Sequence, residues 1–303
     1  MKQLIALMVT LVCAALGADL RFKPAGAGEF EFDTGVLRGK LRPGGKSQGL
    51  SSVVHIPSGA TLSRSVGLFT HYRVFSANHR YGPAAYGWPS EATLREDGAV
   101  EVRWPAAADR PFELWAVYRW SDPAALDLET GVRPQADLPG FEAFLGSYFA
   151  EQFTNSLVYV QAGKPAFLAA EKSDGDWQMF PRDPALVPLI QDGRWNIEPS
   201  PVRWVMRPFL AQPIAVRRDP QSGTTAVLMA PPQDCFAIST PHQSEGHYSL
   251  YLSLFGRTIQ AGETARARAR LVIASSPTEA QILALYQAYL RAPGAGRNQN
   301  NRQ

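Results

Sequence analysis

The chain has 303 residues, of which 45% are hydrophobic and 19% charged, and this composition is typical of a globular protein and excludes a disordered one. Thirty Lys and Arg against 27 Asp and Glu give a formal net charge of +3 without any basic block. Because nucleic-acid binding relies on clustered positive charge, we expect no nucleic-acid partner.

The first 18 residues have the pattern of an export signal. Lys2 provides a positive start, residues 4–16 form an apolar run, and small residues at 15–18 suit cleavage. The run is short for a membrane span and no second hydrophobic segment follows it, so we expect no membrane span. The sequence therefore predicts a signal peptide over 1–18 and a mature chain that starts at Ala18 or Asp19.

The cysteine content also fits an exported protein. Cys13 lies in the predicted signal, which leaves Cys235 without a partner for an internal disulfide. An exported protein without disulfides fits a bacterial periplasm, so we predict a periplasmic or secreted protein. Cys235 stands in an apolar run, where we expect a buried and inert thiol.

Short apolar runs separated by turn residues fill the middle of the chain. The first follows Asp97-Gly98, a hairpin signal. Turn signals recur about every ten residues, the spacing of a β-sandwich rather than of alternating strands and helices. The predicted strands are 99–104, 112–120, 125–132, 157–160, 214–216, 224–229, 235–240 and 248–255.

Residues 264–273 give the clearest strand. Alanines, Leu271 and Ile273 alternate with Arg266, Arg268 and Arg270, so one face of the strand is apolar and the other cationic. The arginine face is either a solvated surface or part of an anion-binding groove.

One helix follows that strand. Ser276 is the predicted N-cap, Pro277 the first helical residue, and apolar residues from Ile282 to Leu290 recur at helical spacing. The tail 293–303 has no apolar anchor, and we expect it to be disordered. The sequence thus predicts a mainly β fold with one C-terminal helix, built as a single domain over 19–292.

Residues 67–88 combine aromatic and cationic side chains in a stretch that we interpret as loop-rich. Aromatic rings stack on sugar rings, and Arg and His donate to hydroxyls or carboxylates. The alternative interpretation is an irregular loop held by its own aromatic residues. The candidate ligand-binding or catalytic residues here are His71, Arg73, His79, Arg80 and Trp88.

A second polar group lies between two predicted strands, where His242, Glu245 and His247 are close in sequence. They fit an acid–base pair or a sugar contact, a metal site, or an exposed polar turn. A third group joins Arg119 to residues 141–149, where Glu142 and Tyr148 either face a cleft or are ordinary sheet residues.

Several common catalytic motifs are absent from the sequence. It contains no phosphate-binding glycine loop, no G-x-S-x-G, no H-E-x-x-H and no paired-cysteine metal motif. These absences argue against nucleotide-dependent chemistry and against the common serine-hydrolase and zinc-protease designs. We predict no cofactor and assign no metal ligands, and metal dependence stays open.

Residues 77–80 (ANHR), which follow His71 and Arg73, and residues 146–149 (GSYF) resemble the aldose 1-epimerase-like, or galactose mutarotase-like, β-supersandwich. The resemblance spans roughly 30–273 and implies a large antiparallel supersandwich. Those epimerases use H-x-Y-F, whose histidine is the acid, and a late glutamate as base. Here Tyr148 and Phe149 match, Gly146 stands at the histidine position, and Glu245 is the nearest candidate base.

The sequence thus predicts an exported carbohydrate-binding or carbohydrate-modifying protein, with epimerase-like or lyase-like chemistry. The alternative is a non-catalytic carbohydrate-binding or structural module of the cell envelope. We expect a carbohydrate partner, and the oligomeric state stays open. The candidate catalytic residues are His71, His79, His242, Glu245 and His247, and the candidate ligand-binding residues are Arg73, Arg80, Trp88, Arg119 and Tyr148. We expect His71, Arg73 and one of His242 and His247 to surround one concave surface.

Overall fold

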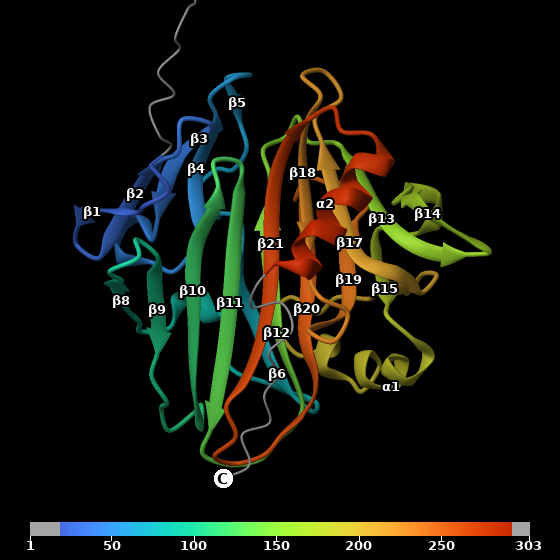
Figure 1. Cartoon of the computed structure of the whole chain (residues 1–303). Coiled ribbons are helices and arrows are strands. Elements are labelled where there is room, and N and C mark those ends of the chain that lie inside the picture. The colour runs from blue at the N-terminus through green and yellow to red at the C-terminus, as the bar shows by residue number, and fades with distance from the viewer. Residues whose placement is uncertain (1–18, 293–303) are drawn as a thin grey trace, which may run out of the picture.

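The structure is a computed structural model that describes residues 19–292, so the predicted signal and tail lie outside it. Within the described residues, three sheets hold most of the chain, and one long helix, α2 (Glu279–Arg291), ends it (Figure 1). The predicted mainly β fold with a C-terminal helix is confirmed. No helix in this part of the chain is both long and apolar enough to cross a membrane.

The first sheet has five antiparallel strands in chain order, and none of them was predicted. They are β1 (Lys23–Gly26), β2 (Glu29–Asp33), β3 (Leu37–Leu41), β4 (Leu50–His55) and β5 (Ala60–Thr61). Phe30 and Phe32 alternate with exposed carboxylates on β2, so only one face of this small sheet is buried. The ring of Phe32 lies 4.8 Å from that of Trp120, which joins the small sheet to the main core.

The second sheet has nine strands and contains most of the predicted ones. Its order is β14 (Lys164–Ala169), β13 (Asn155–Ala162), β17 (Leu210–Arg218), β18 (Thr224–Met229), β21 (Ala265–Ser275), β11 (Ala125–Pro134), β10 (Phe112–Asp122), β9 (Val100–Trp104) and β8 (Glu91–Leu94). Every pair of neighbours in it is antiparallel.

The third sheet has seven strands and carries the candidate site. Its order is β16 (Val205–Met206), β15 (Trp177–Pro181), β19 (Cys235–Pro241), β20 (Ser249–Ile259), β12 (Leu138–Tyr148), β6 (Thr70–Ser76) and β7 (His79–Arg80). Only the short β15–β16 pair is parallel within the described sheet.

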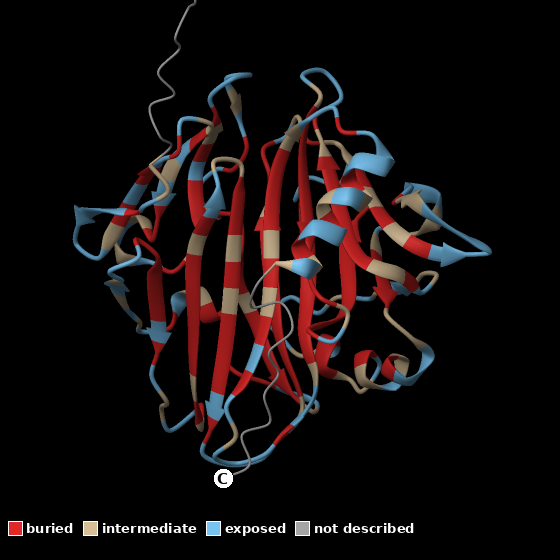
Figure 2. Cartoon of the chain, in the orientation of Figure 1, coloured by how far each residue is buried: buried red, intermediate tan, exposed pale blue. Residues whose placement is uncertain are grey.

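The main core lies between the nine-stranded and seven-stranded sheets, whose central strands are buried along most of their length (Figure 2). Trp104 and Leu128 belong to this core from one sheet, and Ala143 and Leu145 from the other. The Tyr118 hydroxyl satisfies its hydrogen-bonding need inside the core by donating to the Phe69 carbonyl at 2.9 Å. Buried Cys235 belongs to the same core, and burial raises the pKa of its thiol to about 12.

The predicted alternation on β21 is confirmed. Ala265, Ala267 and Ala269 are buried, and the three arginines lie on the outer face of the sheet. Arg266 pairs with Glu129 at 2.6 Å and Arg270 with Asp127 at 2.5 Å, both on neighbouring β11. Arg266 and Arg270 are therefore matched by carboxylates across the strand pair, and Arg268 lies 3.4 Å from the carboxylate of Asp234.

Helix α2 covers the outer face of the nine-stranded sheet with a stripe that includes Ile282, Tyr286 and Tyr289. The predicted N-cap at Ser276 is wrong, because Thr278 occupies that position. The Thr278 hydroxyl accepts from the Gln281 backbone N–H, and the Gln281 side chain accepts from that of Thr278. Ser276 instead belongs to the preceding turn, where its backbone N–H donates to Gly223.

A long excursion between β15 and β16 crosses the outer face of the seven-stranded sheet. It contains three short helices, η4 (Pro184–Leu186), α1 (Val187–Ile190) and η5 (Arg194–Asn196). Trp195 and Ile190 from this excursion pack on Phe75 and Phe144 of the sheet in a second hydrophobic cluster. The excursion therefore covers part of the outer face of the seven-stranded sheet, whose inner face lies against the main core.

Candidate functional site

A β-bulge on β6 decides which side chains reach the outer face of the seven-stranded sheet. Arg73 pairs with Phe144 on β12 whereas His71 pairs with Leu145, so Tyr72 is an extra residue in β6. A bulge interrupts the alternation of side chains along a strand, so residues on its two sides point to different faces than strict alternation predicts. Tyr72 and Arg73 therefore both face outward, and His71 faces the core between the sheets.

Tyr72 and Arg73 line a cavity of about 270 Å³ between the sheet and the excursion. We call it the aromatic pocket, because seven of its described lining residues carry an aromatic ring of Phe, Tyr or Trp. Its lining residues are Tyr72, Arg73, Phe144, Tyr148, Trp177, Trp195, Ser200, Pro201, Val202, Trp204, His247 and Tyr251.

The rings of the pocket are fixed by contacts with one another. Phe144 and Tyr251 stack face to face on the sheet, with their ring centroids 4.6 Å apart. Trp204 stands nearly perpendicular to Trp177 and to Trp195, at 5.8 and 5.2 Å. Edge-to-face pairs of this kind stabilise one arrangement of the rings. The pocket is therefore a rigid apolar box with few polar groups.

Arg73 is the one cationic side chain among the described lining residues, and it is only 2% exposed. Its Nη2 donates to the Ser200 carbonyl at 2.7 Å, and the rings of Tyr72 and Trp195 lie 5.1 and 5.3 Å from its guanidinium carbon. Its Nε and Nη1 have no hydrogen-bond partner. Aromatic faces stabilise a cation, but they leave its N–H groups without acceptors.

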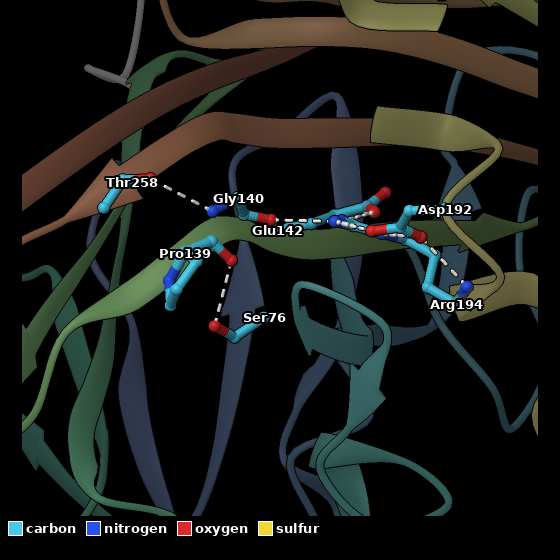
Figure 3. Close-up of polar contacts among 7 residues, drawn as sticks. All are labelled: Ser76, Pro139, Gly140, Glu142, Asp192, Arg194 and Thr258. Atoms are coloured by element: carbon cyan, nitrogen blue, oxygen red, sulfur yellow. Dashed lines mark hydrogen bonds and ion pairs between the residues drawn. The ribbon is translucent and has the colours of Figure 1, made fainter. Parts of the chain in front are cut away.

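The outer wall of the pocket is formed by residues 192–204, which we call the wall segment. A buried ion-pair network holds its first part (Figure 3). Arg194 donates to Glu142 at 2.9 Å, to Asp192 at 2.8 Å and to the Gly140 carbonyl at 3.0 Å. Burial raises the pKa of Glu142, and the charge of Arg194 opposes that rise.

Two more arginines hold the rest of the wall segment by its carbonyl groups. Arg80 donates to the Pro199 carbonyl at 2.7 Å and also to that of Pro83. Arg73 holds the neighbouring Ser200 carbonyl, and Ser200 has the left-handed φ of 64°. Because a non-glycine residue rarely adopts that conformation, the contacts around Ser200 must maintain it.

The loop between β19 and β20 supplies the polar rim of the pocket. The Glu245 carboxylate accepts from the backbone N–H of His247 at 2.9 Å and lies 2.8 Å from His247 Nδ1. A proton on Nδ1 would donate to that carboxylate and leave Nε2 as an acceptor. The His247 ring also contacts Trp177 at 5.2 Å, which places it against the aromatic wall.

A fully buried arginine positions this loop. Arg217 donates to the carbonyls of Gln243 and Ser249, at 3.3 and 3.2 Å, and to that of Phe153 at 3.0 Å. Burial lowers the pKa of Arg217 to about 10. These bonds tie both ends of the loop to β17, and Arg217 itself is held by the Phe153 carbonyl just before β13.

Three of the predicted site residues line the aromatic pocket, namely Arg73, Tyr148 and His247. Two more do not line the pocket but position residues that form it. Glu245 contacts His247, and Arg80 donates to a carbonyl of the wall segment.

The predicted grouping of His71 with Arg73 is wrong, because the bulge at Tyr72 turns His71 into the core. His71 Nε2 lies 2.9 Å from the Thr130 hydroxyl, and the ring lies 5.0 Å from that of Trp104. Burial lowers the pKa of His71 to about 3, so the imidazole is neutral. The interpretation of residues 67–88 as loop-rich is also wrong, since β6 and β7 run through them.

The remaining predicted residues lie away from the pocket. His79 is exposed and packs on Tyr81, and Trp88 is buried beneath the guanidinium of Arg110. Arg119 pairs with Asp97 at 2.5 Å and lines a groove on the outer face of the other large sheet. His242 shares the loop of His247, but its ring lies near Asp176 and Ser244. Over residues 19–292, no group of three or more His, Cys, Asp or Glu side chains is arranged to hold a metal ion.

Gly146, which stands at the histidine position of the resemblance, lies beneath the rings of Tyr148 and Tyr251. A Cβ added there would lie 3.1 Å from the Tyr148 ring and 3.4 Å from that of Tyr251. The two tyrosines occupy the space that a side chain at 146 would need. The pocket therefore has aromatic rings where the resemblance implies an acid.

Sequence reasoning missed most of the aromatic wall. The missed lining residues include Trp177, Trp195, Trp204 and Tyr251, whereas Tyr72 belongs to the aromatic residues of the 67–88 stretch. Three of the seven tryptophans of the chain stand between positions 177 and 204, and that density is the signal in the sequence that points to this segment.

No protein-family model and no curated protein matches the sequence. Among solved structures, the chain is similar to the alpha-N-acetylgalactosaminidase from Bifidobacterium bifidum, with 11% identity and a TM-score of 0.48 over 90% of this chain and 38% of that one. It is also similar to a galactose mutarotase related enzyme from Lactobacillus acidophilus, with 7% identity and a TM-score of 0.48 over 83% and 99%. A TPR-domain containing protein from Parabacteroides distasonis has 10% identity and a TM-score of 0.45 over 90% and 50%.

The chain thus spans well under half the length of the galactosaminidase and nearly all of the mutarotase related enzyme. The mutarotase related enzyme is of the kind that the sequence resemblance named. At these identities the similarity concerns the fold alone.

Proposed function

We propose that this protein is an exported carbohydrate-binding protein whose ligand occupies the aromatic pocket. The observation that carries the proposal is the combination of a rigid aromatic lining with Arg73 and His247 at one cavity. The apolar faces of a sugar ring pack on aromatic rings, and its hydroxyls need a few fixed donors and acceptors. The volume of about 270 Å³ suits a short saccharide or one residue of a longer one.

The stacked pair on the sheet and the tryptophans around it supply the apolar surface that this ligand requires. Phe144 and Tyr251 line the pocket from the sheet, and Trp177 and Trp204 line it from beside them. Polar groups lie at the edges of the box, in Arg73, Ser200 and His247. A purely apolar ligand would leave these groups without partners.

Replacing Trp204 with Ala is expected to weaken saccharide binding at least tenfold, because it removes one side of the aromatic box. A glycan array followed by calorimetry on the best ligand measures this effect. Trp115→Ala is the matched control, since Trp115 packs beside Val117 on the nine-stranded sheet and does not line the pocket. If both variants lose affinity for the saccharide equally, or if neither loses any, the saccharide binds elsewhere.

A catalytic role is a second candidate, favoured by the contact between Glu245 and His247. With Nδ1–H donating to the carboxylate, Nε2 of His247 is oriented as a base at the rim of the pocket. Tyr148, whose pKa burial raises well above its usual range, would act only as a hydroxyl donor or acceptor. These groups fit removal of a proton from a bound sugar, as in lyase-like or epimerase-like chemistry.

His247→Gln is expected to abolish turnover while it changes binding less than threefold, because glutamine keeps a hydrogen-bonding group at the rim of the pocket but is not a base. Saccharide ligands are incubated with both proteins and followed by NMR for new ring or double-bond signals. If the wild-type protein binds a saccharide and leaves it unchanged, the protein is a non-catalytic module.

Export is the part of the proposal that rests on residues 1–18. We expect the mature chain to start at Ala18 or Asp19, because small residues precede that point. Intact-mass measurement of material from the periplasm or the medium determines the start. A folded product that keeps residues 1–17 would contradict export by cleavage.

A further inference from the structure

We propose that the aromatic pocket takes a saccharide that carries a carboxylate, and that this carboxylate binds Arg73 in place of the Ser200 carbonyl. The inference rests on the proposed function, and it adds the chemical class of the ligand. The observation behind it is that Arg73 is buried in the pocket and that two of its three guanidinium nitrogens have no hydrogen-bond partner.

Among the buried arginines of the described chain, Arg73 stands apart because its single acceptor is a neutral carbonyl, whereas the single acceptor of Arg110 is the Asp109 carboxylate at 3.1 Å. Arg194 is paired with two carboxylates, and Arg217 donates to several carbonyls and to the Thr240 hydroxyl. Arg80 reaches three carbonyls. Arg73 has the Ser200 carbonyl alone, and no carboxylate of residues 19–292 lies within ion-pair distance of it.

The surroundings of Arg73 do not neutralise its charge either. None of the described lining residues of the pocket is Asp or Glu. Glu245, the carboxylate at the rim, is engaged by the ring and the backbone of His247. A buried positive charge without a counter-ion is costly, and an anionic ligand is the partner that removes this cost.

The geometry also indicates how the anion reaches Arg73. Nε and Nη1 are covered, and Nη2 is occupied by the Ser200 carbonyl. A carboxylate accepts a stronger, charge-assisted hydrogen bond than a neutral carbonyl does, so it can displace that carbonyl. Ser200 has a left-handed φ of 64°, and release of its carbonyl allows the backbone to leave this conformation.

If the carboxylate displaces the Ser200 carbonyl, ligand binding should loosen the wall segment around Ser200 and leave its two ends in place. The Arg194 network fixes one end, and Trp204 packs on Trp177 and Trp195 at the other. A neutral sugar in the same pocket would leave the bond between Arg73 and Ser200 intact.

The decisive experiment compares an acid with its methyl ester on the same sugar. Trimers of galacturonate, glucuronate and mannuronate, each as free acid and as ester, are titrated calorimetrically into wild-type protein. We expect the acid form of the preferred sugar to bind at least tenfold more tightly than its ester, because only the acid offers a charge to Arg73.

Three variants assign that preference to a residue. Arg73→Gln should bind acid and ester alike, at the affinity of the ester. Arg73→Lys keeps the charge and should retain part of the preference, and it replaces Arg73→Gln if the latter does not fold. Arg119→Gln, on the outer face of the opposite sheet, should behave as the wild type.

The outcomes separate this inference from the proposed function. Equal binding of acid and ester by the wild type would overturn the inference and leave saccharide binding intact. A preference that survives in Arg73→Gln would show that another group receives the anion. If no acidic or neutral saccharide binds at all, the proposed function fails and the inference with it.

Hydrogen exchange provides a readout of the displacement itself. On binding the acid, amide exchange at Glu198, Ser200 and Val202 should rise, and on binding the ester it should not. Unchanged exchange with a bound acid would contradict the replacement of the Ser200 carbonyl.

Discussion

Replacing Arg194 with Met is expected to lower the free energy of unfolding by about 3–5 kcal/mol, because it leaves the carboxylate of Glu142 buried without its partner. The same change should abolish saccharide binding, since Arg194 fixes the start of the wall segment. Urea denaturation measures the first effect, and calorimetric titration of the folded variant measures the second.

The pH dependence of the Arg194 defect tests its electrostatic origin. Without Arg194, burial raises the pKa of Glu142 above the value in the unfolded chain, so the folded variant binds the proton more strongly. The defect is then largest above that raised pKa and shrinks as the pH falls through it. Glu142→Gln combined with Arg194→Met should recover much of the loss at neutral pH. A defect under ~1 kcal/mol that does not change with pH would contradict the ion-pair account.

Ala267→Glu should destabilise the protein by about 3 kcal/mol or more, because Ala267 is 1% exposed and a carboxylate there would be buried without a partner. Thermal and urea denaturation measure the effect.

Arg266→Gln is the matched control for this substitution. Arg266 is the neighbouring residue on the same strand, and its ion pair with Glu129 is exposed to solvent. Its loss should therefore cost less than about 1 kcal/mol. Similar stability of the two variants would mean that the faces of β21 are not as described.

The strands that the sequence predicted best are those whose pattern is local. On β21, each buried alanine alternates with an arginine, and the alternation alone identifies both faces. The N-terminal sheet was missed because its strands are short and one of them, β1, has no buried residue. Its stability comes from contacts such as that between Phe32 and Trp120, which are distant in sequence.

The candidate site was predicted only in part, for two physical reasons. Strict alternation puts His71 and Arg73 on one face, and a single extra residue in β6 separates them. The wall of the pocket depends on the pairing of Arg194 with Glu142, which are 52 residues apart. Neither the bulge nor this pairing leaves a pattern in the local sequence.

The most direct test of the proposed function is a crystal structure of the protein with the saccharide that a glycan array selects. We predict that the sugar ring packs against the aromatic rings of the aromatic pocket, with a polar group of the ligand within hydrogen-bonding distance of Arg73. A saccharide bound in the arginine-lined groove beside α2, with the aromatic pocket empty, would contradict this account.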